Sequence, residues 1–321
     1  MYTKEIKEKL RGPLTALITP MRENYEVDYE GLRILIRNAK QAGFGKGKGA
    51  IMVCGAGGEG IYLTDEERWK VLETAVDEAK GEVPILMGIN EFSTKKTIEA
   101  INTAGKIGAL ACQVAPPHYW PATDEDIIQF FKDLSKGIRE NVGVMVYNCW
   151  FRGGYARPEV LAKIAEFDHI VGVKWSTPLP WEHSDITLFA NKLVVIDDTT
   201  LHVEAYLYGA NGNMSAMGDH YPIFDIQQWE RMESGKYEEW MKEWIRAALP
   251  FRRFRGKIKK RVMGESPTKK AACYLMGLPG GPPRPPLRPL NEEEINELRE
   301  ILKKAGLPVV CLLYTSPSPR D

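Results

Sequence analysis

Short apolar runs alternate with amphipathic stretches from residue 14 to residue 215. Each run is apolar at nearly every position, as in parallel strands that are buried on both faces. Between the runs, apolar residues recur at the three- and four-residue spacing of a helix that buries one face. The runs predict strands over residues 14–19, 50–54, 84–88, 109–114, 143–147, 170–174, 193–196 and 212–215.

The stretches between the runs predict the helices of a strand–helix repeat. Thr64 and Glu67 form the pattern of a capping box, in which each side chain accepts a backbone N–H at the helix start. Eight strand–helix units favour an α/β fold of the (β/α)8 TIM-barrel type, and a doubly wound open sheet is the alternative. The predicted helices cover residues 28–42, 64–80, 94–107, 124–139, 158–166 and 202–208.

After residue 223 the pattern becomes helical. Trp229, Trp240 and Trp244 predict helices that pack on the outside of the barrel. The Pro-rich stretch 278–290 predicts a rigid connector, with a polyproline ligand for an aromatic groove as the alternative. A final helix is expected over residues 292–305.

These patterns predict two structural units and a foreign tail. We expect a barrel domain over residues 1–223 and a C-terminal helical extension over 224–310. Residues 311–321 resemble the translation of a transposon-type sequencing adapter, so we expect them not to be native. A natural Ser/Pro-rich tail is the alternative.

The charge balance narrows the class of partner. The 43 basic and 43 acidic side chains cancel, which argues against a nucleic-acid partner or an anionic membrane surface. No apolar run approaches the roughly 18–20 residues that span a bilayer. The charged N-terminus and the five scattered cysteines favour a cytoplasmic protein without disulfides. A small molecule or a second copy of the chain is the expected partner.

The ends of the predicted strands are the first candidates for chemistry, because barrel active sites are built there. Lys174 closes an apolar strand. Burial disfavours its ammonium form, and a neutral amine can attack a ketone to form an imine. A rim lysine whose charged end reaches the solvent explains the same position equally well.

Three further features near strand ends suit ligand binding. The segment 54–60 is rich in glycine, so its backbone N–H groups can approach a carboxylate closely. Tyr147 can transfer a proton, and Arg152 can hold a carboxylate with two hydrogen bonds. Taken singly, each of these residues is more often structural.

Acidic and histidine side chains at two other places have the chemistry of metal ligands. Asp197, Asp198 and His202 form one group, and Asp219 and His220 form the other. A Schiff-base enzyme needs no metal, so we expect neither a metal nor a cofactor.

Taken together, these positions resemble the dihydrodipicolinate synthase / N-acetylneuraminate lyase family of class I Schiff-base aldolases. The resemblance runs from about residue 12 to residue 305, and it rests on the joint order of several short motifs. These motifs lie at residues 16–20, 55–59, 116–121, 147–148, 172–174, 209–212 and 282–286.

The resemblance implies a role for each site residue. Lys174 is expected to form a Schiff base with pyruvate or a related 2-oxo acid, and Tyr147 to relay protons. The amides of Gly57 and Gly58 are expected to hold the substrate carboxylate, and Arg152 to bind a carboxylate on the second substrate.

The resemblance also predicts an oligomer. Tyr119 matches a tyrosine that, in many members of the family, reaches into the active site of the neighbouring subunit. A homodimer or homotetramer is therefore expected. We also expect Ala56 and Met214 to line the substrate pocket.

Several residues depart from the family pattern. Ala56 and Gly57 stand where the synthases have two threonines, the first of which links two tyrosines in a proton relay. His118 replaces a tyrosine, and the aromatic residues Trp175 and 150–151 are expected to make the acceptor pocket near the mouth more apolar.

These departures set the expected function apart from the lysine-biosynthetic synthase. We expect a carbon–carbon lyase or aldolase that acts on pyruvate or a related 2-oxo acid. Two alternatives stay open: a dehydratase of 2-oxo-3-deoxy sugar acids, and a non-catalytic homologue that only binds a 2-oxo acid.

Overall fold

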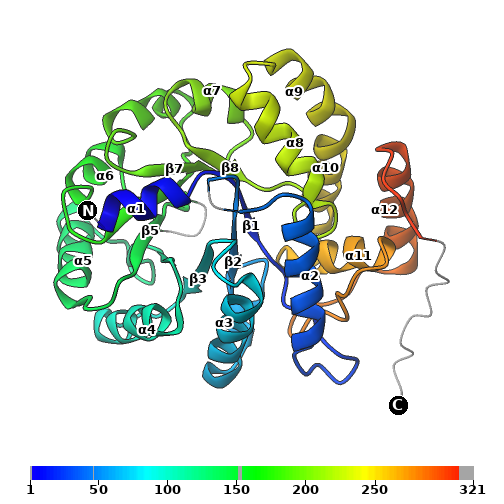
Figure 1. Ribbon diagram of the computed structural model, residues 1–321, viewed down its shortest axis with the longest axis horizontal. Helices are drawn as coiled ribbons and strands as arrows, with labels where there is room; N and C mark the ends of the chain where they lie inside the picture. Colours follow the sequence, from blue (N-terminus) through cyan, green and yellow to red (C-terminus); the bar gives the residue numbers. More distant parts are fainter. Residues whose placement is uncertain (1, 46, 151–153, 311–321) are drawn as a thin grey trace.

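The computed structural model of the chain describes residues 2–45, 47–150 and 154–310. Eight parallel strands form a closed barrel, because each strand pairs with the next and β8 pairs with β1 (Figure 1). The predicted barrel is confirmed, and the open sheet is excluded. The strands are β1 Gly12–Ala16, β2 Ala50–Val53, β3 Ile85–Ile89, β4 Ala111–Val114, β5 Gly143–Tyr147, β6 Ile170–Trp175, β7 Val194–Asp197 and β8 Gly212–Met214.

Helices surround the barrel in the order that the sequence predicts (Figure 1). The capping box is present, with Thr64 Oγ1 accepting from the Glu67 N–H and the Glu67 carboxylate accepting from the Thr64 N–H. The helix between β6 and β7 was not predicted, because the nine-residue 3₁₀ helix η3 Pro180–Leu188 lacks the α-helical repeat. The other barrel helices are α2 Tyr29–Gln41, α3 Asp65–Ala79, α4 Thr94–Ile107, α5 Asp124–Gly137, α6 Pro158–Ile164, α7 His202–Leu207 and α8 Pro222–Glu233.

A short N-terminal helix, α1 Tyr2–Lys9, closes the N-terminal end of the barrel. Its pattern was too short to predict a helix. Ile6 and Leu10 are only 1% and 2% exposed, and they pack into the cluster of side chains inside the barrel, which includes Leu86 and Met145. This helix therefore acts as the floor of the barrel interior.

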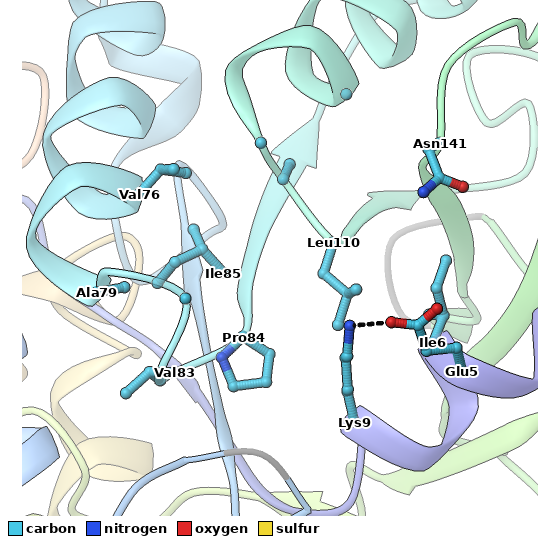
Figure 2. A pocket seen from close by; sticks show the side chains of 14 residues that line it. Glu5, Ile6, Lys9, Val76, Ala79, Val83, Pro84, Ile85, Leu110 and Asn141 are labelled. Atoms are coloured by element: carbon cyan, nitrogen blue, oxygen red, sulfur yellow. Dashed lines mark hydrogen bonds and ion pairs between the residues drawn. The ribbon is translucent and has the colours of Figure 1, made fainter. Parts of the chain in front are cut away.

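A groove of about 400 Å³ lies between α1 and the starts of β3 and β4 (Figure 2). Pro84 and Leu110 line it, and Lys9 Nζ lies 2.6 Å from a carboxylate oxygen of Glu5. The groove is at the N-terminal end of the barrel, at the opposite end from the strand termini that carry Lys174 and Tyr147.

The C-terminal extension packs against the barrel through a second hydrophobic cluster. Trp229, Trp240 and Trp244 are all buried in this cluster, and the rings of Trp240 and Trp244 stack with centroids 5.1 Å apart. The elements of the extension are α9 Tyr237–Glu243, the π-helical turn η4 Trp244–Ala248, α10 Leu249–Ile258, α11 Ser266–Leu275 and α12 Glu292–Lys304.

The predicted domain boundary between residues 223 and 224 falls inside α8. This helix packs on β1 and α2, as the eighth helix of a barrel does. The division into two domains stays a prediction, and residues 311–321 lie outside the described residues. Within the described ranges, no helix combines the length and the apolar character that crossing a membrane requires.

The floor of the barrel provides a stability test. Truncation of Ile6 in the variant Ile6→Ala is expected to lower the free energy of unfolding by about 2–4 kcal/mol, because it leaves a cavity among close-packed apolar side chains. Urea unfolding followed by circular dichroism measures the change. Lys4→Ala, on the exposed side of the same helix, is the control and is expected to be nearly neutral. Equal effects of the two variants would show that α1 does not support the barrel.

Candidate active site

Neighbouring strands bring Tyr147 and Lys174 to the same level at the C-terminal end of the barrel. The two residues are register partners across β5 and β6. Lys174 is 7% exposed, and its Nζ lies 4.4 Å from the centroid of the Tyr147 ring and 3.1 Å from Asp198 Oδ2. The Lys174 amine is thus buried beside an aromatic ring and a carboxylate, and it does not extend from the rim into solvent.

The residue after Lys174 points to the other side of the strand. Trp175 is fully buried, with its ring centroid 5.3 Å from that of Phe189 in the layer between strands and helices. The expectation that Trp175 lines the mouth is wrong, because consecutive residues of a strand face opposite sides. Trp150 is 45% exposed, and residue 151 lies outside the described residues.

Asn148 and Ser176 join the ends of β5 and β6. The Asn148 N–H donates to the Lys174 carbonyl at 3.1 Å, and Ser176 Oγ donates to the Asn148 carbonyl at 2.6 Å. The Asn148 side chain also accepts from the Ala156 N–H at 2.7 Å. These bonds extend the pairing of β5 with β6 past the ends of the two strands, and they hold Lys174 and Tyr147 in register.

The glycine loop that follows β2 is held by a buried carboxylate. Glu59 is fully buried, and it lies 2.9 Å from Lys270 Nζ and accepts from the Arg284 N–H at 3.0 Å. Cys54 and Glu59 adopt the left-handed backbone region, with φ of 55° and 57°. Such conformations cost energy in residues with side chains, so the loop depends on these contacts for its shape.

Two amides of this loop are available to a ligand. Ala56 and Gly57 line a cavity together with Lys174. Among the described residues, the N–H groups of Ala56 and Gly57 have no protein acceptor. The Gly58 N–H, in contrast, donates to the Gly55 carbonyl at 3.0 Å. These two N–H groups are therefore free to donate to an acceptor in the cavity.

This cavity has a volume of about 30 Å³, enough for a water molecule. Of the predicted residues, it brings together Lys174, Tyr147, Ala56, Gly57 and Met214. Tyr147 also lines a second, larger pocket of about 600 Å³ nearer the surface. Two adjacent spaces thus share the Tyr147 side chain.

The structure adds residues that the sequence analysis missed. Gln113 on β4 is 5% exposed, and its Oε1 has no partner among the described residues. A polar residue within an apolar strand was a usable signal for Gln113. No local pattern marked Lys269, which reaches the cavity from the C-terminal extension, as Arg252 does. Asp198, named above only as a candidate metal ligand, also lines the cavity, and the added residues are Ala16, Met52, Gln113, Ser215, Arg252, Arg255, Glu265 and Lys269.

The charged residues from the extension surround an ionised carboxylate. Burial by itself would raise the pKa of Glu265, but Arg255, Lys259 and Lys269 lie close enough to lower that pKa well below its usual value. Arg252 packs over the Trp244 ring at 5.5 Å and donates to the Thr199 carbonyl at 3.3 Å. The extension therefore forms a charged wall of the cavity.

The sequence profile of the Dihydrodipicolinate synthetase family matches residues 9–305. The chain belongs to this family. The relatives of this chain in the family are lyases of the class I aldolase type, and this chain is also such a lyase. Among its relatives, the 4-hydroxy-tetrahydrodipicolinate synthase of Aquifex aeolicus is 31% identical over 93% of this chain and 99% of its own length. An "Uncharacterized DapA-like lyase" of Pyrobaculum arsenaticum is 30% identical over 93% of this chain and 99% of its own length.

Solved structures of the family have the same fold. The dihydrodipicolinate synthase of Aquifex aeolicus is 28% identical, covers 94% of this chain and 99% of its own, and superposes with a TM-score of 0.81. A structure described as the first monomeric dihydrodipicolinate synthase variant gives a TM-score of 0.83 at 27% identity, over 94% of this chain and 98% of its own.

Two other family positions, Tyr119 and Gly58, do not line the cavity. Tyr119 is 74% exposed in the loop after β4, with its ring centroid 6.0 Å from Phe92 and 5.5 Å from Trp120. Gly58 lies outside the cavity lining, and its carbonyl accepts from Thr19 Oγ1 at 2.6 Å. Arg152 lies outside the described residues.

The two acidic–histidine groups form no metal site among the described residues. Asp197 instead accepts from Thr199 and pairs with His202 Nδ1. Burial would raise the pKa of Asp197, but His202 and Thr199 beside it hold that pKa below its usual value. The His202 ring packs 5.0 Å from Trp244, so this pair joins the barrel to the extension.

A buried histidine beside the site predicts acid sensitivity. Burial lowers the pKa of His220 from 6.5 to about 4, and neither ring nitrogen has a partner among the described residues. The unfolded chain gains a proton near pH 6.5, whereas the folded protein resists it until about pH 4. The stabilisation is therefore complete above pH 6.5 and is lost as the pH falls through 4, and it amounts to about 3 kcal/mol.

The variant His220→Leu removes this titration and no hydrogen bond. Its free energy of unfolding is expected to fall less steeply than that of the wild type between pH 6.5 and 4, as measured by urea unfolding at several pH values. Asp225, whose pKa burial raises to about 6, titrates in both proteins and cancels in the comparison. Parallel pH profiles would contradict the assignment.

Proposed function

We propose that the protein forms a Schiff base between Lys174 and pyruvate or a related 2-oxo acid, and then makes or breaks the adjacent carbon–carbon bond. The observation that carries the proposal is a buried lysine amine in the same cavity as two unpaired loop N–H groups. The amine suits the ketone, and the N–H groups of Ala56 and Gly57 suit the carboxylate next to it.

The chemistry begins at the Lys174 nitrogen. Asp198 Oδ2, 3.1 Å from Nζ, can accept the proton that the ammonium must lose. The free amine attacks the ketone carbon, and the carbonyl oxygen leaves as water with the two amine hydrogens. The resulting C=N bond withdraws electrons, so a proton or a carbon substituent can leave the neighbouring carbon as the enamine forms.

Proton transfer after imine formation falls to Tyr147. Ala56 provides no hydroxyl for the relay expected in the synthases, so Tyr147 works without that link. The buried Gln113 side chain lines the same cavity as Tyr147, and its unpaired Oε1 can accept a hydrogen bond there. We propose that the amide of Gln113 helps to order a proton-carrying water in place of the missing hydroxyl.

The larger pocket beyond Tyr147 suits the second substrate. Ile61, Phe92, His118 and Cys149 contribute to its lining. These side chains favour an acceptor or leaving aldehyde with an apolar part. This feature supports an aldolase with a substrate different from that of the lysine-biosynthetic enzymes.

Borohydride trapping tests the Schiff base. Incubation with pyruvate and borohydride is expected to add one reduced pyruvate to each chain, located on Lys174 by peptide mass spectrometry. Lys174→Arg keeps the charge and is expected to show no adduct and a loss of activity of at least about 1,000-fold. An unmodified wild-type chain would refute the proposal. An adduct without turnover of any 2-oxo acid and aldehyde pair would instead indicate the non-catalytic homologue.

We further propose that a second copy of the chain covers the exposed aromatic cluster of Phe92, His118, Tyr119 and Trp120. Phe92, Tyr119 and Trp120 are 73%, 74% and 77% exposed. Contiguous exposed aromatic side chains are typical of protein–protein contacts. Contact between the clusters of two chains would form the expected homodimer or homotetramer, in which Tyr119 approaches the partner's site.

Trp120→Glu tests this contact. A buried, unpaired carboxylate opposes association, so the variant is expected to shift toward the 36.2 kDa monomer in light scattering, while its circular dichroism spectrum is unchanged. Ile245→Glu, at an exposed apolar residue of the extension, is the control and should keep the wild-type mass. A wild type that is already monomeric would refute the proposed contact.

A further inference from the structure

The most unusual group in the cavity is a second buried lysine. Lys269 on α11 is 4% exposed and lines the same cavity as Lys174 and Gly57. Its Nζ lies 2.8 Å from Asp219 Oδ2 and donates to the Ala16 carbonyl at 2.7 Å. An ammonium has three donors, and among the described residues only these two acceptors are present, so one donor is left for a ligand.

Asp219 holds this ammonium in place. Its second carboxylate oxygen, Oδ1, accepts from the Ile18 N–H at 2.8 Å. The Lys269 ammonium is therefore fixed between β1 and the segment after β8, and it is not free to swing into solvent. A charge fixed in advance loses little entropy when it binds a ligand.

The absence of a side chain at residue 57 is what makes room for Lys269. A Cβ atom on Gly57 would lie 2.9 Å from Lys269 Nζ and 2.7 Å from the Ala16 carbonyl oxygen, closer than real Cβ contacts allow. A side chain at residue 57 and the Lys269 ammonium thus compete for the same space. A threonine at residue 57 would therefore require the Lys269 ammonium and the Ala16 carbonyl to shift from these positions.

We infer that Lys269 binds the carboxylate of the 2-oxo acid, in place of the side-chain hydroxyl that is missing at residue 57. The inference rests on the proposed Schiff-base function and names a binding residue for it. The ammonium supplies a charge-assisted hydrogen bond, stronger than the one from a neutral hydroxyl, beside the two loop N–H groups. The site therefore selects ketones that carry an adjacent carboxylate over neutral ketones.

The charged side chains around the cavity carry a net positive charge, which favours binding of this anion. The charged side chains that line the cavity are Lys174, Arg252, Arg255 and Lys269, against Asp198 and Glu265. These four positive and two negative side chains leave an excess of two positive charges. Asp219, which is ion-paired with Lys269, lowers that excess to one. A substrate carboxylate would balance that excess.

The test compares an anionic ketone with a neutral one. The yield of the borohydride-reduced adduct on Lys174 is measured against the concentration of pyruvate, and then of pyruvamide, which has no carboxylate. In Lys269→Met, the half-saturating pyruvate concentration is expected to rise about 10- to 100-fold, as for loss of a hydrogen bond to a charged group. The adduct yield at saturation and the pyruvamide curve are expected to stay as in the wild type.

Two further variants separate binding from folding. Lys269→Met leaves the Asp219 carboxylate buried without its partner, so Lys269→Met with Asp219→Asn is prepared in parallel and is expected to show the same shift. Lys260→Met, an exposed lysine of the extension, is the control and should follow the wild-type curves.

An unchanged pyruvate curve in both Lys269 variants would overturn the inference. So would an equal shift for pyruvate and pyruvamide, since this would give Lys269 a purely structural role. In both cases the wild type still forms the adduct, so the proposed Schiff-base function stands. A wild type that forms no adduct with either ketone would refute the proposed function, and the inference with it.

Discussion

Two consecutive buried ammonium groups on α11 constrain the whole mouth of the barrel. Lys269 and Lys270 are 4% and 2% exposed, and a buried charge without a partner costs several kcal/mol. Each is therefore tied to a carboxylate of the barrel: Lys269 to Asp219 after β8, and Lys270 to Glu59 in the glycine loop. Through these pairs a helix outside the barrel determines the shape of the loop that faces Lys174.

The site is consequently shared between the barrel and the extension. The strands contribute the Lys174 amine and the Tyr147 phenol, and their positions follow from the register of β5 and β6. The extension contributes the charges around them, with Arg252 packed on Trp244 and joined to the Thr199 carbonyl. A ligand in this cavity would contact side chains from the strands and from the helices beyond β8.

Much of the fold could be predicted from the pattern of apolar positions. Runs that are apolar at every position become strands buried on both faces, and caps such as Thr64 with Glu67 mark a helix start. The misses have physical reasons as well. The helix α1 is only eight residues long, and η3 has a different repeat. Trp175 faces away from the barrel mouth because consecutive residues of a strand point to opposite sides, and Lys174 points inward.

The sequence by itself determined the alternation of strands and helices and the lysine at the end of the sixth strand, because periodicity and order are properties of neighbouring residues, and the count of eight strands favoured a barrel over an open sheet. It also showed that two threonine positions hold Ala56 and Gly57. Only the tertiary structure decided what occupies the vacated space. Lys269 is more than 200 positions away from Gly57, and its ammonium comes within 2.9 Å of where a Cβ at residue 57 would lie only because α11 packs beside the glycine loop.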